Sequence, residues 1–101
     1  MTYHPEAEKD LKKLDNSRRI LALKAIKKVS TNPLPKQRGG YGTPLGSKQG
    51  NNLTGFYKIK LRGIGIRVVY RIVETKGEMN VIVVGIREDN EVYKLAYKRI
   101  E

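Results

Sequence analysis

Two short stretches of the chain concentrate cationic side chains in a pattern that could act on a phosphate group. The stretch YKIKLR (57–62) alternates apolar with basic residues, and RVVYRIV (67–73) follows it after a glycine-containing turn. Such alternation predicts two β-strands that pair as a hairpin. The cations that these strands carry are Lys58, Lys60, Arg62, Arg67 and Arg71.

The register of this hairpin decides whether the cations gather. With a two- or four-residue turn centred on residues 63 and 64, opposite residues have numbers that sum to 127. Lys60 then faces Arg67, with Lys58 on the same surface, whereas a three-residue turn would break this pairing. Like charges directly opposite each other destabilise a sheet by roughly 0.2–1 kcal/mol. Lysines and arginines that protect a solvated sheet edge are the alternative, but they explain one or two cations better than five.

The overall charge favours a polyanionic partner. The 101 residues include 21 Lys and Arg against 10 Asp and Glu, a net charge of +11. Residues 16–73 contain no acidic residue, yet they hold 13 of the 21 basic ones. A patch of this kind attracts phosphate polyanions such as RNA. An acidic partner protein, or a basic protein with no polyanionic ligand, remains an alternative at this stage.

Several classes of site are excluded by the residue types. The chain has no cysteine, which removes disulfides, thiolate metal sites and cysteine nucleophiles and is typical of a reducing cytosol. His4 is the only histidine and directly precedes Pro5 at a helix start, so we interpret it as structural or solvated. No carboxylate cluster suggests a metal site, and we expect no metal and no cofactor. Without an apolar run of about 18 residues or a signal-like segment, no membrane partner is expected.

The remaining residue types could still cleave RNA. Metal-free cleavage needs a base for the 2′-hydroxyl, an acid for the 5′-oxygen and positive charge at the phosphate. Neighbouring cations disfavour the charged form of a lysine, so Lys60 or Lys58 could act as the base. Arginines would hold the phosphate through their planar fork. We expect such chemistry to be slow unless something else positions the substrate.

The periodicity of apolar residues predicts the elements that hold these side chains. Residues 5–31 predict an antiparallel helical hairpin, and 88–101 a terminal helix. The segment 79–85 is apolar on both faces and therefore predicts an interior strand. The predicted strands are 54–61, 66–73 and 79–85. Together they predict one α+β domain over residues 1–101, in which a small antiparallel sheet packs against the N-terminal helical hairpin, with a short C-terminal helix.

Residues 32–52 predict a long loop between the helical hairpin and the first predicted strand. Three prolines and several glycines interrupt any regular periodicity there. Loops longer than about 12–15 residues are usually functional or disordered. The segment could be a mobile arm that touches RNA through Lys36, Arg38 and Lys48, or a simple flexible insertion.

The stretches FYKIKLRGIGIRVVYRIV (56–73) and VIVVGIREDNEVYKLAYKRI (81–100) resemble the RelE branch of the RelE/ParE toxin superfamily. PEAEKDLKKL (5–14) is similar to the first helix of that family. The resemblance implies a RelE-like fold and a toxin of a type II toxin–antitoxin system that cleaves mRNA in the ribosomal A site. The family usually begins with a full strand, for which only residues 1–3 remain here, and residues 36–52 form a longer loop than usual.

The resemblance also implies roles for individual residues. Lys60 would be the general base and Lys58 would stabilise charge. Arg67 would bind the scissile phosphate, Arg87 would be the general acid, and Tyr93 would stack on the mRNA base. Further RNA contacts are expected from Arg62, Arg71, Lys36, Arg38 and Lys48.

The implied partners are a cognate antitoxin, the ribosome with its 16S rRNA, and mRNA, and the implied location is cytoplasmic. Two rival functions remain. A toxin of the ParE type would inhibit DNA gyrase with the same fold but without the lysine–arginine set. A noncatalytic RNA-binding domain would need the charges but no particular geometry.

Overall fold

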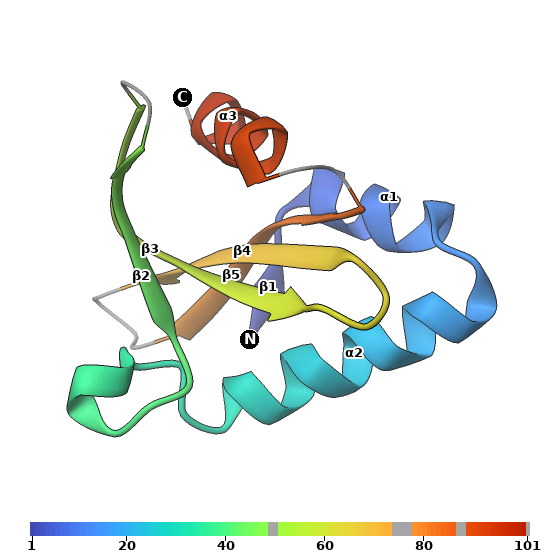
Figure 1. Ribbon diagram of the computed structural model, residues 1–101, viewed down its shortest axis with the longest axis horizontal. Coiled ribbons are helices and arrows are strands. Elements are labelled where there is room, and N and C mark those ends of the chain that lie inside the picture. Colours follow the sequence, from blue (N-terminus) through green and yellow to red (C-terminus); the bar gives the residue numbers. More distant parts are fainter. Residues whose placement is uncertain (49–50, 74–77, 87–88, 101) are drawn as a thin grey trace.

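A computed structural model describes residues 1–48, 51–73, 78–86 and 89–100. A short strand comes first along the chain, followed by two α-helices, a 3₁₀ helix, four further strands and a last α-helix (Figure 1). The elements are β1 (Thr2–Tyr3), α1 (Pro5–Lys13), α2 (Asn16–Ser30), the 3₁₀ helix η1 (Lys36–Arg38), β2 (Thr43–Lys48), β3 (Asn51–Leu61), β4 (Ile66–Val73), β5 (Glu78–Gly85) and α3 (Asp89–Arg99).

Five strands form one sheet in the order β1-β5-β4-β3-β2. The neighbours from β2 to β5 are antiparallel, whereas β1 pairs parallel to β5 through Thr2 and Tyr3. The sheet is therefore mixed, and the first strand is present but very short. β5 lies between β1 and β4, which confirms the interior position that its apolar faces predicted.

The β3–β4 hairpin has the predicted register. Lys60 lies opposite Arg67, and Lys58 lies opposite Val69. The last pair before the turn is Leu61 with Ile66, so the turn has an even number of residues and preserves the pairing. The pairing of like charges across this hairpin is thus a property of the fold.

The predicted helical hairpin is confirmed as α1 and α2. His4 precedes α1, and its Nδ1 accepts a hydrogen bond of 3.1 Å from the backbone N–H of Glu6, so the only histidine caps this helix. The Arg19 guanidinium in α2 donates hydrogen bonds to the carbonyl oxygens of Leu11 at 2.9 Å and Leu14 at 2.7 Å. It thereby satisfies carbonyl groups that the end of α1 leaves without helical partners.

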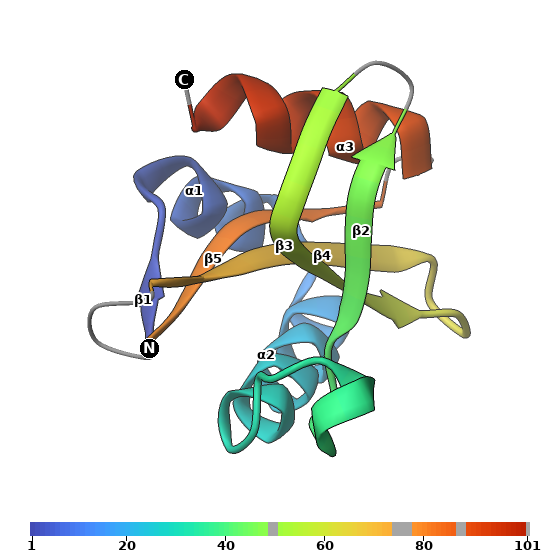
Figure 2. The same ribbon diagram turned by 90° about the vertical axis from the view of Figure 1, so that its left-hand side faces the viewer.

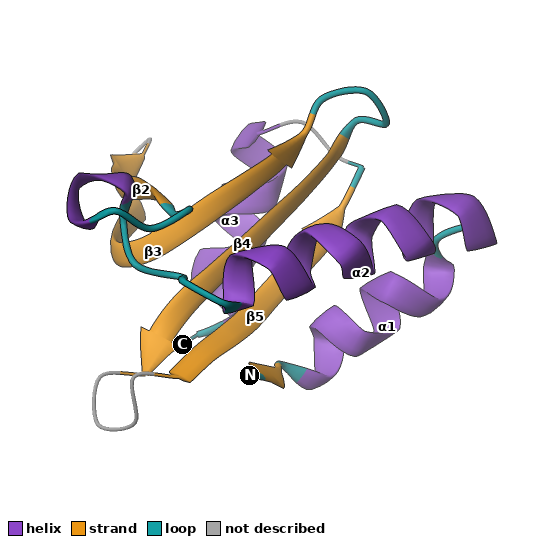
Figure 3. Ribbon diagram, turned by 90° about the horizontal axis from the view of Figure 1, so that it is seen from below, coloured by secondary structure: helices purple, strands orange, loops and turns teal. Residues whose placement is uncertain are grey.

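The helices cover opposite faces of the sheet. α1 and α2 lie on one face and α3 lies on the other, as the view from below shows (Figure 3). The view in Figure 2 shows the sheet between α3 and α2. The hairpin-side core includes Ala7, Leu11, Leu14, Ala22, Ile26, Val29, Ile66, Val68, Tyr70 and Val81. The α3-side core consists of Leu45, Phe56, Val69, Ile82, Val83, Val92, Tyr93 and Ala96.

An ion pair ties α3 to α1 and β5. The Arg99 guanidinium meets the Asp10 carboxylate in two contacts, Nη1 to Oδ2 at 2.7 Å and Nη2 to Oδ1 at 3.1 Å. Nη1 also donates to the carbonyl oxygen of Ile82 at 2.9 Å, and Asp10 accepts from the backbone N–H of Val84 at 3.0 Å. Both side chains are mostly buried, with 11% and 12% exposed.

The prediction that residues 32–52 form a long loop is wrong over much of that segment. It contains η1 and β2, and β3 begins at Asn51, three residues earlier than the predicted strand. β2 is a strand of the sheet because it pairs with β3 from Thr43 opposite Lys58 onward. Prolines and glycines concealed this strand, since their usual effect is to interrupt β-structure. β2 lies at the edge of the sheet, where such residues are tolerated.

Candidate functional site

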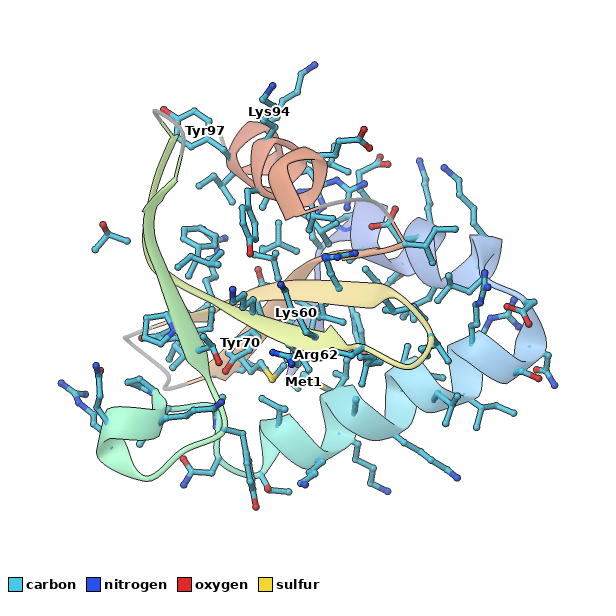
Figure 4. The ribbon with its side chains drawn as sticks, in the orientation of Figure 1. Met1, Lys60, Arg62, Tyr70, Lys94 and Tyr97 are labelled. Atoms are coloured by element: carbon cyan, nitrogen blue, oxygen red, sulfur yellow. The ribbon has the colours of Figure 1, made fainter. Side chains whose placement is uncertain are left out.

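The strand cations lie on the face of the sheet that α3 partly covers. Residues directly opposite each other in an antiparallel pair point to the same face. Lys58 lies opposite Val69, which packs in the α3-side core, so Lys58, Lys60 and Arg67 share that face. Lys60 is exposed, whereas Lys58 and Arg67 are half-buried. Figure 4 shows Lys60 and Arg62 close together near the end of β3.

The first of two hollows, the loop-side hollow, lies between β3 and the segment that contains η1. Its volume is about 450 Å³. Two of its residues, Lys36 and Tyr41, come from the segment before β2, and the others come from β2, β3 and the turn that follows. The lining residues are Lys36, Tyr41, Thr43, Lys58, Ile59, Lys60 and Arg62.

The second hollow, the turn-side hollow, lies at the β3–β4 turn and has a volume of about 230 Å³. Lys60 and Arg67 both line it, so the like-charged pair opens onto a common space. Its lining residues are Lys60, Leu61, Arg62, Gly65, Ile66 and Arg67. Among the described residues that line the two hollows there is no carboxylate. The two hollows therefore suit an anionic ligand.

Arg87 lies outside the described residues, so its position relative to the hollows is not defined. The last described residues before it are Gly85, which lies opposite Arg67, and Ile86, whose side chain is 55% exposed. Arg67 itself is half-buried.

Tyr93 lies in the α3-side core and is only 5% exposed. The core around it includes Phe56, Val69 and Ala96. An aromatic ring in this setting cannot stack on a base unless α3 changes its position. This burial was not predicted from the sequence, although the helical spacing of Val92, Tyr93 and Ala96 puts them on one side of α3.

The other predicted RNA contacts are more dispersed. Arg71 lies on the same face but farther along β4, where its Nε donates to Asn80 Oδ1 at 3.3 Å. Arg38 is exposed on η1 and does not line either hollow among the described residues. Lys48 ends β2 opposite Asn51, and its side chain lies outside the described part of the chain.

The segment that carries Lys36 is held against the sheet by a buried tyrosine. The Tyr70 hydroxyl donates to the carbonyl oxygen of Pro33 at 2.8 Å, and its ring stacks on Tyr57 with centroids 5.4 Å apart. Burial raises the pKa of the Tyr70 hydroxyl above its usual value, and charge interaction with Tyr57 adds to this effect. A side chain at Gly42 would place its Cβ 2.5 Å from the Tyr70 hydroxyl, so this close approach requires glycine.

Two lining residues, Tyr41 and Thr43, were not predicted as part of a site. Tyr41 stood in the predicted loop, and no periodicity related it to the strand lysines. Their contribution depends on a contact between segments far apart in the sequence.

The described part of the chain offers no metal site and no membrane span. No three His, Asp or Glu side chains in it lie close enough together to hold a metal ion. None of the helices there is both long and apolar enough to cross a bilayer.

Comparison with known proteins identifies the family. Residues 1–93 match the family described as ParE toxin of type II toxin-antitoxin system, parDE. A RelE-like toxin protein of Escherichia coli is 32% identical over 98 residues, which cover 97% of this chain and 93% of that protein. The mRNA interferase toxin RelE of Escherichia coli K12 is 49% identical over 55 residues, covering 52% of this chain and 58% of RelE.

Solved structures agree with the sequence relatives. The crystal structure of the isolated Escherichia coli RelE toxin is similar with a TM-score of 0.69 and 32% identity, covering 99% of this chain and 96% of RelE. The intact RelBE toxin–antitoxin complex from the same organism contains a similar chain with a TM-score of 0.64 and 30% identity, covering 86% of this chain and 94% of that one. This chain therefore belongs to the RelE/ParE family of toxins from type II toxin–antitoxin systems.

Proposed function

We propose that this toxin is a metal-independent, ribosome-dependent endoribonuclease that cleaves mRNA in the A site and so inhibits translation. The observation that carries the proposal is the register of β3 and β4, which brings Lys58, Lys60 and Arg67 to one face. Lys60 and Arg67 also line the same hollow. The similarity to RelE, an mRNA interferase, supports RNA as the target.

The proposed chemistry is an internal transfer of the phosphate within the RNA. Lys60, in its neutral form, accepts the proton of the 2′-hydroxyl, and the resulting oxygen attacks the adjacent phosphorus. The bond from phosphorus to the 5′-oxygen breaks, and Arg87 supplies a proton to that leaving oxygen. The products are a 2′,3′-cyclic phosphate and a free 5′-hydroxyl. Arg67 and Lys58 stabilise the extra negative charge on the phosphate as the transition state forms.

Dependence on the ribosome follows from the weakness of these groups. Lysine and arginine are poor proton carriers near neutral pH, because both side chains ordinarily stay protonated there. General acid–base catalysis is most effective when the pKa lies near the operating pH. A partner that holds the RNA in an attacking geometry can compensate, since orientation alone can supply many orders of magnitude in rate. We assign that task to the ribosome.

Tyr93 is the residue whose proposed role requires a conformational change. Stacking on an mRNA base needs an accessible ring, yet only 5% of Tyr93 is exposed. The proposal therefore includes a displacement of α3 when the toxin meets its substrate.

The proposal includes control by an antitoxin. The relative RelE is bound to the antitoxin RelB in the intact complex. We propose a cognate antitoxin for this chain as well, with acidic residues that complement its net charge of +11.

Inhibition of DNA gyrase is the second candidate, because the matching family is named after ParE toxins. The strand cations argue for the endonuclease instead, since in our hypothesis gyrase inhibition does not need Lys58, Lys60 and Arg67 in one register. Both activities can be measured on the same preparation.

The deciding experiment adds the purified toxin to a translating extract and maps the ends of the mRNA. We expect cuts in frame at codons held by the ribosome, while the same RNA without ribosomes is cut poorly. A supercoiling assay with gyrase runs in parallel. Intact mRNA together with inhibited gyrase would transfer the assignment to the second candidate.

A further inference from the structure

The loop-side hollow has two lining residues from a segment that the proposed chemistry does not use. Lys36 and Tyr41 come from the segment before β2, whereas the chemistry rests on β3 and β4. Lys36 adds a fourth cation to Lys58, Lys60 and Arg62, and none of the described lining residues is acidic. A hollow with four cations and an aromatic ring needs an explanation beyond the single scissile phosphate.

Backbone hydrogen bonds hold the segment before β2 in one conformation, so the backbone position of Lys36 is defined. The backbone N–H of Lys36 donates to the carbonyl oxygen of Gly42 at 2.9 Å. The N–H of Gly42 in turn donates to the carbonyl oxygen of Leu34 at 2.9 Å. A Cβ at Gly40 would lie 2.0 Å from the Leu34 carbonyl oxygen, which shows how tightly the segment is folded. A flexible insertion would have neither these hydrogen bonds nor this close packing.

Tyr41 is an exposed aromatic residue in this segment, with 46% of its surface accessible. Its backbone N–H donates to the carbonyl oxygen of Asn32 at 3.0 Å, so its side chain is not required for that anchoring bond. Lys28 Nζ lies 5.2 Å from the ring centroid, which adds a cation beside the ring. Exposed aromatic rings beside cations are the usual means by which proteins bind single-stranded nucleic acid.

The two hollows are adjacent, since Lys60 and Arg62 line both. The pairing of β2 with β3 begins at Thr43 opposite Lys58, so β3 extends past β2 at this point. An RNA strand with a phosphate in the turn-side hollow can therefore continue directly into the loop-side hollow.

We propose that the loop-side hollow is a nucleotide subsite for the substrate strand, in which Lys36 contacts an RNA phosphate and Tyr41 stacks on the neighbouring base. The subsite deepens the proposed endonuclease function and rests on it for the identity of the strand. It assigns a positioning role to the segment before β2, separate from the chemistry at Lys60 and Arg67.

Binding of a short RNA to the isolated toxin tests the subsite without the ribosome. The probe is a fluorescent single-stranded RNA with 2′-O-methyl groups at every position, which cannot be cleaved because the attacking hydroxyl is blocked. Anisotropy titrations at several salt concentrations compare the parent with Lys36→Ala, Tyr41→Ala and Tyr41→Phe. Lys94→Ala is the matched control, since it removes the same charge from α3, where Lys94 points away from the molecule (Figure 4). Thermal melts of each variant confirm that it folds.

We expect Tyr41→Ala to weaken binding by roughly tenfold, the lower part of the range for loss of one stacked base, while Tyr41→Phe retains it. Lys36→Ala should lower the salt dependence, with a slope of log K smaller by about 0.7, the value for one contact to a single strand. Lys94→Ala should leave the slope unchanged. Equal effects of Lys36→Ala and Lys94→Ala would overturn the subsite, because only general charge would then matter.

A second arm separates the substrate strand from rRNA as the source of the phosphate. Binding of the same variants is measured to ribosomes with and without a codon in the A site. We expect Lys36→Ala and Tyr41→Ala to weaken the additional binding that is seen when a codon occupies the A site. A loss confined to ribosomes without a codon would overturn the assignment to the substrate strand. Absence of ribosome-dependent cleavage by the parent would refute the proposed function, whereas the binding titrations would still decide the subsite.

Discussion

Arg99 and the cations around the two hollows are the same kind of residue in opposite settings. Arg99 is 11% exposed, meets Asp10 in two contacts and donates to a backbone carbonyl. Lys60 and Arg67 lie opposite each other and line a space without a described carboxylate. A buried charge is tolerated only when it is paired and hydrogen-bonded, because removal from water is costly. Lys60 and Arg67 are not enclosed in this way, since Lys60 is exposed and Arg67 is half-buried, and both line the turn-side hollow.

Arg19 resembles Arg99, because its guanidinium also donates to acceptors inside the fold. It donates to three carbonyl oxygens at the end of α1 and so joins α1 to α2. Arg19 and Arg99 donate to internal acceptors, whereas Lys60 and Arg67 lie opposite each other and line one hollow. Composition alone cannot distinguish the two, since both contribute equally to the net charge.

The largest expected effect comes from breaking the buried pair. Arg99→Ala should lower the free energy of unfolding by about 3–5 kcal/mol, because it leaves the Asp10 carboxylate buried without its partner. Urea unfolding measures the change. Lys98→Ala, at an exposed neighbour, should stay within about 0.5 kcal/mol. The double variant Asp10→Ala/Arg99→Ala should be less destabilised than the sum of the single changes, and simple additivity would contradict the pairing.

The next effect separates function from stability. Arg67→Ala should reduce ribosome-dependent cleavage by roughly 10²–10³-fold, the loss typical of one group that stabilises transition-state charge. Its melting temperature should change little compared with that of Arg99→Ala, since Arg67 is only half-buried. Lys98→Ala provides the activity control. A collapse of stability in Arg67→Ala would mean that this arginine belongs with Arg99 on the structural side.

Tyr70 lies on the opposite face of β4, in the hairpin-side core, and its effect on stability can be compared with that of the cations. Because the folded state raises the pKa of Tyr70 above its ordinary value of 10.0, the unfolded chain ionises first as the pH rises. The stability contributed by Tyr70 should be fully present below about pH 10 and should decline above it. Tyr70→Phe should lower the free energy of unfolding by about 1 kcal/mol at neutral pH, because it removes the hydrogen bond to Pro33. Its free energy of unfolding should also decline less steeply at alkaline pH than that of the parent. Urea titrations from pH 8 to pH 11 test this, and identical alkaline slopes would contradict it.

The smallest effect is the repulsion between Lys60 and Arg67 themselves. A double-mutant cycle with alanine at each position should give an unfavourable coupling of about 0.2–1 kcal/mol. The coupling should decrease in high salt, since screening acts strongly on exposed charges. A favourable coupling would show that the pair is stabilising and would remove the contrast with Arg99 and Asp10.

Much of the fold could be predicted because it depends on local patterns. Apolar spacing identified the helical hairpin, alternation identified β3 and β4, and a run that is apolar on both faces identified β5. The even turn between Leu61 and Ile66 then set the partner of each strand residue. The shared face of Lys58, Lys60 and Arg67 was therefore predictable for an even turn, and the structure has that turn.

The segment before β3 could not be predicted in this way. β2 contains Pro44 and Gly46, and it is a strand because β3 offers it a partner. Tyr41 reaches the loop-side hollow because Tyr70 and Pro33 hold the preceding segment against the sheet. Such contacts join residues 37 positions apart and leave no periodic pattern.

The sequence alone determined the helices, three strands and the excess of cations over acids, because each depends on neighbours in the chain or on counting. The register of the β3–β4 hairpin followed from the sequence only on the condition of an even turn, which the structure has. Tertiary structure alone decided that Arg99 lies in an ion pair and that Lys60 and Arg67 line a common hollow. Asp10 and Arg99 meet across 89 positions of sequence, and α3 buries Tyr93 by packing on the sheet. The environment of a charge or a ring depends on what folds against it, and that information is distributed over the entire chain.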